Sequence, residues 1–254
     1  ESRGPGGPSG LPPLIQSARQ LAPGIAYIRF SAFFGTDEEL EGVRKFLADQ
    51  REAKALIFDL RNHHGGGLAE QDLIFSAIFD RPTPLVKLAM AKSIYDQHGS
   101  PFGNAKSVQF VIEGDKIVAT HSAVPDADSP LRRAKVYVLT SNRTASAAEH
   151  FALALKSSGR GLLIGAATAG ANHCGGPAEL NANFNVWMPV GRTYDIRTGR
   201  DWEGTGVAPD VEADPAEALV VALQRAGLSP EEAKRINAEE TPAEPVHSDK
   251  LRAR

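Results

Sequence analysis

The chain has 254 residues, of which 42% are hydrophobic and 23% are charged, and its formal net charge at pH 7 is -3. These values are those of a globular protein of one or two domains, and they exclude a fibrous or wholly disordered chain. Because 28 Lys and Arg stand against 31 Asp and Glu, there is no basic excess to neutralise phosphates, so nucleic acid is not expected as a partner.

Both ends of the chain have the composition of tails. Residues 1–13 are rich in Gly, Pro and Ser and are expected to form a flexible tail or the remnant of a linker. They lack the regions of a signal peptide, and no apolar run in the chain approaches the ~18 residues of a membrane span. Residues 227–254 are expected to form a short helix and a disordered tail, which leaves residues 14–226 as the core domain.

The first half of this core predicts alternating strands and helices. Residues 25–30 have the pattern of a strand, and Thr36 followed by Glu39 is a capping box that opens a helix ending near Asp49. Residues 55–60 form a continuous apolar run, which is typical of a strand buried on both faces. This run therefore predicts a largely parallel sheet.

Three glycines, residues 65–67, interrupt the chain before a helix expected at 69–79. Residues 108–120 have the pattern of a hairpin that turns at 114–115. We expect this hairpin to be peripheral.

The second half repeats the alternation of strand and helix. A buried strand at 135–140, a helix of small residues at 146–157 and a strand at 162–165 form a third βαβ-like unit. Three further elements follow: a glycine-rich loop at 168–177, a strand at 183–190 and a closing amphipathic helix at 215–226.

Ser146 stands between a buried strand and the first turn of a helix. A helix N-terminus presents unpaired N–H groups and a partial positive charge, which stabilise an alkoxide or a developing oxyanion. The N–H of Ala147 is placed to donate to a substrate carbonyl. An ordinary N-cap serine fits the same local features, so both interpretations remain open.

The glycines at 65–67 are equally ambiguous. They form a simple turn, or they let backbone N–H groups approach a substrate with no Cβ in the way. They do not fit G-x-G-x-x-G, and the chain has no P-loop Gly-Lys-Ser/Thr, so binding of a dinucleotide is disfavoured.

Four motifs in order along residues 25–225 resemble those of the C-terminal-processing (tail-specific) peptidase superfamily, which includes the tricorn core protease and the interphotoreceptor retinoid-binding protein modules. They are Asp-Leu-Arg-Asn before Gly-Gly-Gly, TASAAE at 144–149, GAATAGAN at 165–172 and GTGVAPDV at 204–211. The resemblance implies an α/β fold with a ClpP/crotonase-like core of stacked ββα units. It also implies a serine peptidase that acts on extended polypeptides outside the cytoplasm and needs no metal or other cofactor.

The site residues that the resemblance implies are the nucleophile Ser146, oxyanion donors at Ala147 and at Gly66 or Gly67, and the supporting residues Glu149 and Thr168. The tail-specific branch carries a general-base lysine where this chain has Ala171. The loop instead resembles the tricorn and retinoid-binding branch, whose Ser–His–Ser–Glu tetrad has a glutamate that matches Glu203. The histidine of that tetrad lies upstream of the core, so the base is expected from a removed N-terminal domain or from another copy in a homo-oligomer.

Histidines within the chain are the alternative bases. His173 lies in the loop that carries the lysine of the other branch, and His150 follows Ser146 by one helical turn, where packing is the simpler interpretation. His63 and His64 flank the glycines and are placed to contact a bound peptide. No local context supports a role for the remaining three, His98, His121 and His247. No pair has the ligand spacing of a zinc site.

Two non-peptidase functions remain as alternatives. The first is a noncatalytic module that binds a hydrophobic ligand or peptide on the same fold. The second is acyl-CoA chemistry, which fold analogy alone suggests. Retention of Ser146 with Glu203 favours the enzyme, whereas the missing lysine favours the binding module and predicts weak activity of the isolated chain.

Overall fold

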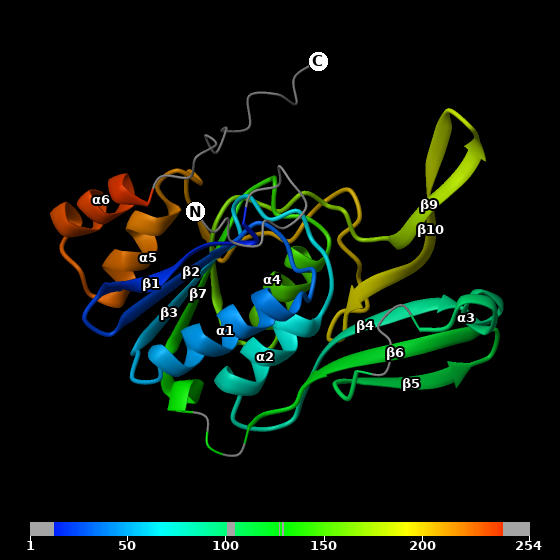
Figure 1. The fold of residues 1–254 in the computed structure, drawn as a ribbon, viewed down its shortest axis with the longest axis horizontal. Helices are drawn as coiled ribbons and strands as arrows, with labels where there is room; N and C mark the ends of the chain where they lie inside the picture. The colour runs from blue at the N-terminus through cyan, green and yellow to red at the C-terminus, as the bar shows by residue number, and fades with distance from the viewer. Residues whose placement is uncertain (1–12, 101–104, 127, 129, 241–254) are drawn as a thin grey trace, which may run out of the picture.

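The computed structural model of the chain describes residues 13–100, 105–126, 128 and 130–240. The expected tails at 1–12 and 241–254, together with His247, lie outside this range. Two sheets lie side by side, the first flanked by helices and the second forming the opposite end of the molecule (Figure 1). Among the described residues, no helix combines the length and apolar character that crossing a bilayer requires.

The first sheet is largely parallel, as the apolar run at 55–60 predicts. Its strand order is β1-β2-β3-β7-β8-β11, and only β1 runs antiparallel to its neighbour. The strands are β1 (Ile15–Ala22), β2 (Ile25–Phe30), β3 (Ala55–Asp59), β7 (Lys135–Thr140), β8 (Leu162–Gly165) and β11 (Val211–Glu212).

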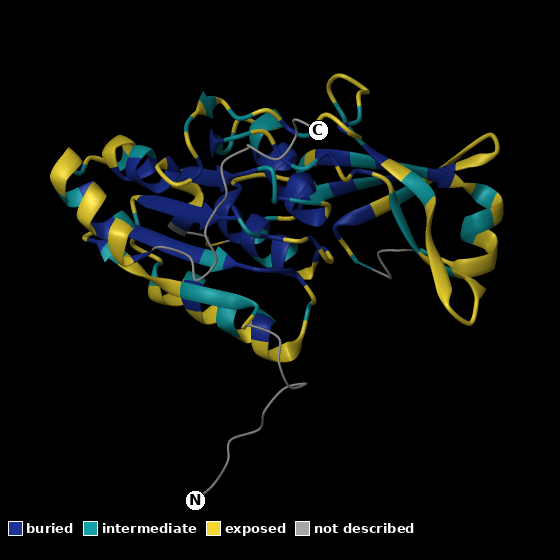
Figure 2. Ribbon diagram, turned by 90° about the horizontal axis from the view of Figure 1, so that it is seen from above, coloured by how far each residue is buried: buried dark blue, intermediate teal, exposed yellow. Residues whose placement is uncertain are grey.

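Helices cover both faces of this sheet, because successive residues of each strand point to opposite sides. Ile28 and Phe58 pack with α1 (Asp37–Asp49), α2 (Ala69–Ile78) and α4 (Ala147–Ser157). Tyr27 and Ile57 pack on the other side with α5 (Ala218–Ala226) and α6 (Pro230–Glu239). Figure 2 shows the resulting buried strands between helices with exposed outer faces.

The core extends beyond the expected limit at residue 226. In α6, Ala233 and Ile236 are buried against the α5 face of the sheet, and the side chain of Glu240 accepts a hydrogen bond from Arg19 at 2.5 Å. The amphipathic spacing of this helix places both apolar residues on one side. Residues up to 240 therefore belong to the folded domain.

The second sheet is antiparallel, with strand order β5-β6-β4-β10-β9. The expected hairpin at 108–120 lies at its edge, and the glycine-rich segment becomes a strand from Cys174 onward. Gly175 permits this pairing, because a Cβ there would lie 2.1 Å from the carbonyl oxygen of Met188. The remaining elements are β4 (Thr83–Ala91), α3 (Lys92–His98), β5 (Val108–Glu113), β6 (Lys116–Ala123), a 3-10 turn (Pro130–Arg133), β9 (Cys174–Asn181) and β10 (Phe184–Asp195).

The topology brings two loops together. Strands β3 and β7 are parallel neighbours, with Asp59 opposite Leu139, so both end at the same edge of the sheet. Functional groups of α/β proteins gather at this edge. The loop after β3 contains the three glycines, and the loop after β7 leads to Ser146.

Candidate active site

Hydrogen bonds join the loops that follow β3 and β7. Thr144 donates from Oγ1 to the carbonyl oxygen of Leu60 at 2.7 Å, and the Ala145 N–H donates to that of His63 at 2.9 Å. A Cβ on Gly65 would lie 2.7 Å from the Cβ of Ser146 and 3.2 Å from its Oγ. The first of the three glycines, Gly65, is therefore in direct contact with Ser146.

Ser146 has a backbone conformation that is unfavourable for any residue with a side chain. Its φ of 55° and ψ of -118° make it the one non-glycine residue with positive φ in the described part of the chain. The residue is exposed and immediately precedes α4. A serine held at such a strained strand-to-helix turn presents its hydroxyl outward, as nucleophiles of hydrolases do.

Two backbone N–H groups beside Ser146 are free to bind an oxyanion. Within the described residues, the N–H groups of Gly66 and Ala147 have no acceptor. The N–H of Gly67 is already engaged, because it donates to the carbonyl oxygen of Phe33 at 2.6 Å. Of the two glycines that the resemblance offers, the geometry therefore favours Gly66.

Phe33 fixes the orientation of the free Gly66 N–H. The two residues form a parallel bridge, and a Cβ on Gly66 would lie 1.8 Å from the Phe33 carbonyl oxygen. Only glycine fits this approach, and its φ of 133° is also outside the range of other residues.

Gln71 links the glycine loop to the start of α4, a contact that the sequence did not reveal. Its Nε2 donates to the carbonyl oxygens of Gly67 at 3.1 Å and of Ala147 at 3.0 Å. The side chain is buried, so it holds the glycine loop at a fixed distance from the start of α4.

Two carboxylates hold the loop in which Ala171 stands at the lysine position of tail-specific peptidases. Glu149, fully buried, accepts from Gly170 N–H at 2.7 Å and from Ala171 N–H at 2.8 Å. Glu203 accepts from the next two N–H groups, those of Asn172 at 2.8 Å and His173 at 3.0 Å. Four consecutive backbone donors are thus fixed by one carboxylate from α4 and one from the segment before Gly204.

Glu149 also connects this loop to Ser146. Its Oε2 accepts from the Ser146 N–H at 2.8 Å, and its Oε1 accepts from Thr168 Oγ1 at 2.6 Å. Thr168 Oγ1 in turn accepts from the Val207 N–H at 2.7 Å. Glu149 and Thr168 therefore tie the 168–171 segment to Ser146, and Ala171 lies beside Ser146.

The histidines of the sequence have different surroundings. His173 is partly exposed with Nδ1 3.8 Å from Glu203. It lines a cavity of about 390 Å³ whose other walls come from β4, β10 and the start of β6. Ser146 is not among the residues that line this cavity. His63 is fully buried against Phe33. Its burial, and to a smaller extent the nearby His64, lowers its pKa to about 3.

His121 and His150 form a buried pair that the sequence did not indicate. Nδ1 of His121 and Nε2 of His150 are 2.8 Å apart, and Nε2 of His121 is 2.9 Å from Asp72 Oδ1. No group of three or more His, Cys, Asp or Glu in the described ranges is arranged to hold a metal ion. These contacts join α2, β6 and α4, which local sequence patterns do not relate.

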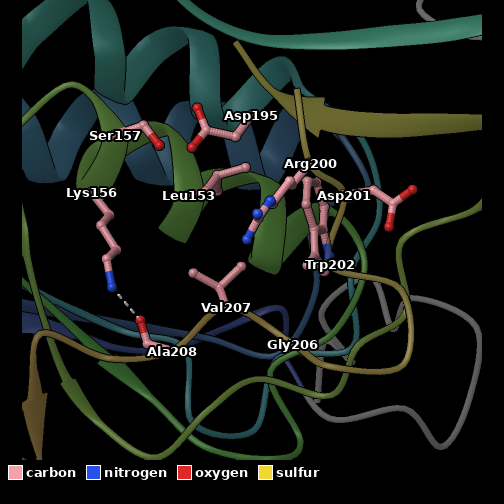
Figure 3. A pocket seen from close by; sticks show the side chains of 10 residues that line it. All are labelled: Leu153, Lys156, Ser157, Asp195, Arg200, Asp201, Trp202, Gly206, Val207 and Ala208. Carbon is pink, nitrogen blue, oxygen red and sulfur yellow. Dashed lines mark hydrogen bonds between the residues drawn. The ribbon is translucent and has the colours of Figure 1, made fainter. Parts of the chain in front are cut away.

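A separate cavity of about 210 Å³ lies between the C-terminal half of α4 and the segment 195–208 (Figure 3). Lys156 Nζ donates to the Ala208 carbonyl oxygen at 2.6 Å across its edge, and Trp202 forms part of the wall. Neither Ser146 nor Gly66 lines this cavity, so it is separate from the site around Ser146.

An acid pair supports the segment that carries Phe33. Glu39 Oε2 accepts from the Phe34 N–H at 3.1 Å, and Glu70 Oε1 accepts from the Gly35 N–H. Both side chains are buried. Burial, together with the neighbouring Glu70 carboxyl, raises the pKa of Glu39 to about 8.

The raised pKa of Glu39 predicts that the protein becomes less stable as the pH rises. The pKa of Glu39 is about 8 in the fold against an ordinary value of 4.5, so the folded state binds more protons between these values. The free energy of unfolding should therefore decrease as pH rises through this window. Glu39→Gln, which keeps a neutral hydrogen-bonding side chain, should flatten the slope in urea unfolding at pH 5.5, 7 and 9. Equal slopes for both proteins would contradict the raised pKa of Glu39.

Comparison with known proteins places these features in one family. Residues 24–213 match peptidase family S41. The chain is 30% identical over 205 residues to the chloroplastic C-terminal processing peptidase of Tetradesmus obliquus, covering 78% of this chain and 38% of the relative. It is 26% identical over 200 residues to the carboxyl-terminal-processing protease of a Picosynechococcus species, covering 78% of this chain and 41% of the relative. The chain thus spans less than half the length of these curated relatives.

Solved structures confirm the α/β fold. The photosystem II D1 C-terminal processing protease superposes with a TM-score of 0.54 at 25% identity, covering 75% of this chain and 42% of that protein. A peptidase-like protein of Parabacteroides merdae superposes with a TM-score of 0.62 at 19% identity, covering 84% of this chain and 64% of the other. The second likeness bears on the fold alone.

Proposed function

The chain belongs to peptidase family S41, and we propose that it hydrolyses peptide bonds of extended polypeptides with Ser146 as the nucleophile. The observation that carries this proposal is the conformation of Ser146, which is exposed at φ 55° beside free N–H groups. A noncatalytic binding module has no use for a serine held in this strained backbone. The peptidase is therefore the better account.

The proposed reaction begins when Ser146 Oγ attacks the carbonyl carbon of the substrate. The N–H groups of Ala147 and Gly66 donate to the oxyanion that forms. Gln71 bonds to the carbonyl oxygens of Ala147 and of Gly67, the residue after Gly66, and so holds together the two segments that carry these donors. The amine leaves with a proton, and a water molecule then hydrolyses the acyl-enzyme. No step calls for a metal or another cofactor.

The carboxylates have supporting roles in this proposal. Glu149 holds the Ser146 backbone and the 170–171 segment, while Glu203 holds Asn172 and His173. Glu203 thus orients the loop beside the nucleophile, and its contact with His173 at 3.8 Å keeps this histidine as a candidate for proton transfer. The relatives are named for processing of carboxyl termini, and we propose an unstructured C-terminal segment as the substrate class.

Covalent labelling tests the proposal directly. A fluorophosphonate, which reacts with activated serines, should add to Ser146, and peptide mapping by mass spectrometry should find it there. The labelled protein should no longer cleave an unstructured peptide that the free protein cleaves. Addition to another serine, or cleavage that survives complete labelling, would remove Ser146 from the mechanism.

A further inference from the structure

A chain of three hydrogen-bonding side chains runs from Asp72 on α2 through His121 on β6 to His150 on α4. Asp72 Oδ1 is 2.9 Å from His121 Nε2, and His121 Nδ1 is 2.8 Å from His150 Nε2. The two imidazoles are buried, with exposed fractions of 3% and 6%. Ser107 donates to the second carboxylate oxygen of Asp72 at 2.8 Å, which fixes the outer end of the chain.

With Asp72 ionised and both rings neutral, the two contacts allow one arrangement of protons. An ionised Asp72 only accepts hydrogen bonds, so His121 donates to it from Nε2–H. In a neutral His121 the other ring nitrogen, Nδ1, is then an acceptor, and His150 must donate to it from Nε2–H. This leaves Nδ1 of His150 without a proton, as an acceptor at the inner end of the chain.

The inner end of the chain lies one helical turn from the nucleophile. The His150 N–H donates to the Ser146 carbonyl oxygen at 3.0 Å, and side chains four residues apart share a helix face and lean toward its N-terminus. Nδ1 of His150 has no partner among the described residues, yet it is not one of the buried unpartnered atoms there, unlike Nε2 of His63. This ring nitrogen is therefore not completely shielded from solvent, although the residue as a whole is only 6% exposed.

We infer that Asp72, His121 and His150 form a proton relay that provides the general base for Ser146, an inference that rests on the proposed peptidase function. The Ser146 hydroxyl proton passes to His150 Nδ1, directly or through one water molecule. The His150 Nε2 proton passes to His121 Nδ1, so the positive charge comes to rest beside Asp72. When the amine departs it takes a proton from His150 Nδ1, and both transfers reverse.

The surroundings of the relay are consistent with this charge movement. Burial and the neighbouring His121 hold the pKa of His150 well below its ordinary value, so its ring is neutral before reaction. The groups that face the two rings are the Asp72 carboxylate from α2, each other, and the ring of Phe75, whose centroid is 5.7 Å from that of His121. Glu149, also on α4, is directed to the 168–171 loop instead.

Kinetics of labelling and of peptide cleavage across pH test the relay. His150→Gln should lower both rates at neutral pH by about 10²–10⁴-fold, the usual range for a general base. Added imidazole should restore part of the rate in His150→Gly, a rescue that a purely structural histidine would not show. The matched control is His98→Gln, an exposed histidine on α3, which should leave both rates unchanged.

Asp72→Asn serves as a second variant that keeps the packing, since its amide can still accept from His121 and pair with Ser107. Loss of the anion makes protonated His121 less stable, so the acid limb of the rate profile should move to lower pH. Thermal unfolding of each variant identifies any that fail to fold.

The tautomers give a signature that does not depend on activity. In ¹⁵N NMR spectra of histidine-labelled protein at neutral pH, both His121 and His150 should carry their proton on Nε2. A proton on Nδ1 of His150 would overturn the relay. If wild-type Ser146 reacts and His150→Gln reacts equally fast, the relay alone is wrong. If wild-type Ser146 does not react at all, the proposed peptidase function fails and the relay fails with it.

Discussion

Replacing Ser146 by alanine should abolish peptide cleavage, and replacing it by glycine should abolish cleavage while making the fold more stable. Loss of an activated serine costs up to about 10⁶-fold in turnover. The φ of 55° and ψ of -118° impose strain of about 1–3 kcal/mol on a residue with a Cβ. Glycine relieves this strain in the folded state. Its greater conformational freedom in the unfolded chain offsets part of the effect, so the free energy of unfolding should rise by about 1 kcal/mol.

Cleavage assays and urea unfolding of the three proteins measure both effects. Ser158→Gly at the other end of α4 is the matched control, because its φ of -76° suits any residue. There, glycine should destabilise, since it removes the hydrogen bond from Ser158 Oγ to the Ala154 carbonyl oxygen at 2.7 Å. A Ser146→Gly protein no more stable than Ser146→Ala would show that the turn stores no strain. Cleavage by Ser146→Ala would place the nucleophile elsewhere.

Local patterns were enough to predict the layer that carries the site. The apolar runs at 55–60 and 135–140 indicated buried parallel strands, and β3 and β7 are such strands. Their parallel pairing then brings the glycines to Ser146, as the motifs required. Strand β9 was missed because its glycines have low strand propensity. The close approach of the Gly175 backbone to Met188 accounts for one of the two glycines.

The sequence could not predict contacts between residues far apart in the chain. His121 lies 49 positions from Asp72 and 29 from His150, and no periodic pattern connects the three. The choice of Gly66 over Gly67 as the oxyanion donor depended on a tertiary contact, because the Phe33 carbonyl oxygen accepts a hydrogen bond from the Gly67 N–H. Glu203 was expected in the site. The hydrogen bonds that its carboxylate accepts from the Asn172 and His173 N–H groups became visible only in the fold.

Introducing a lysine at Ala171 should restore cleavage to a His150→Gln protein by about 10²–10⁴-fold. The N–H groups of Ala171 and Ser146 donate to the same oxygen of Glu149, each at 2.8 Å, so the two backbones are close neighbours. Ala171 is exposed, which leaves room for the longer side chain. The Glu149 carboxylate already accepts four hydrogen bonds, so it is not free to capture the new amine as an ion pair.

The pH dependence separates lysine rescue from any other cause. A lysine acts as a base only when neutral, and its reference pKa of about 10.4 lies well above that of histidine. The positive end of α4 lowers the pKa of this lysine but leaves it alkaline. The cleavage rate of the protein with both His150→Gln and Ala171→Lys should therefore still rise with pH where the wild-type rate has become constant. Lysine at Ala167, an exposed alanine of the same loop that Glu149 does not contact, adds the same charge as a control. Of the two lysine positions, only 171 is tied to the Ser146 backbone through Glu149. Equal rates for the two lysine variants would mean that the added positive charge raises the rate and that the amine does not act as a base.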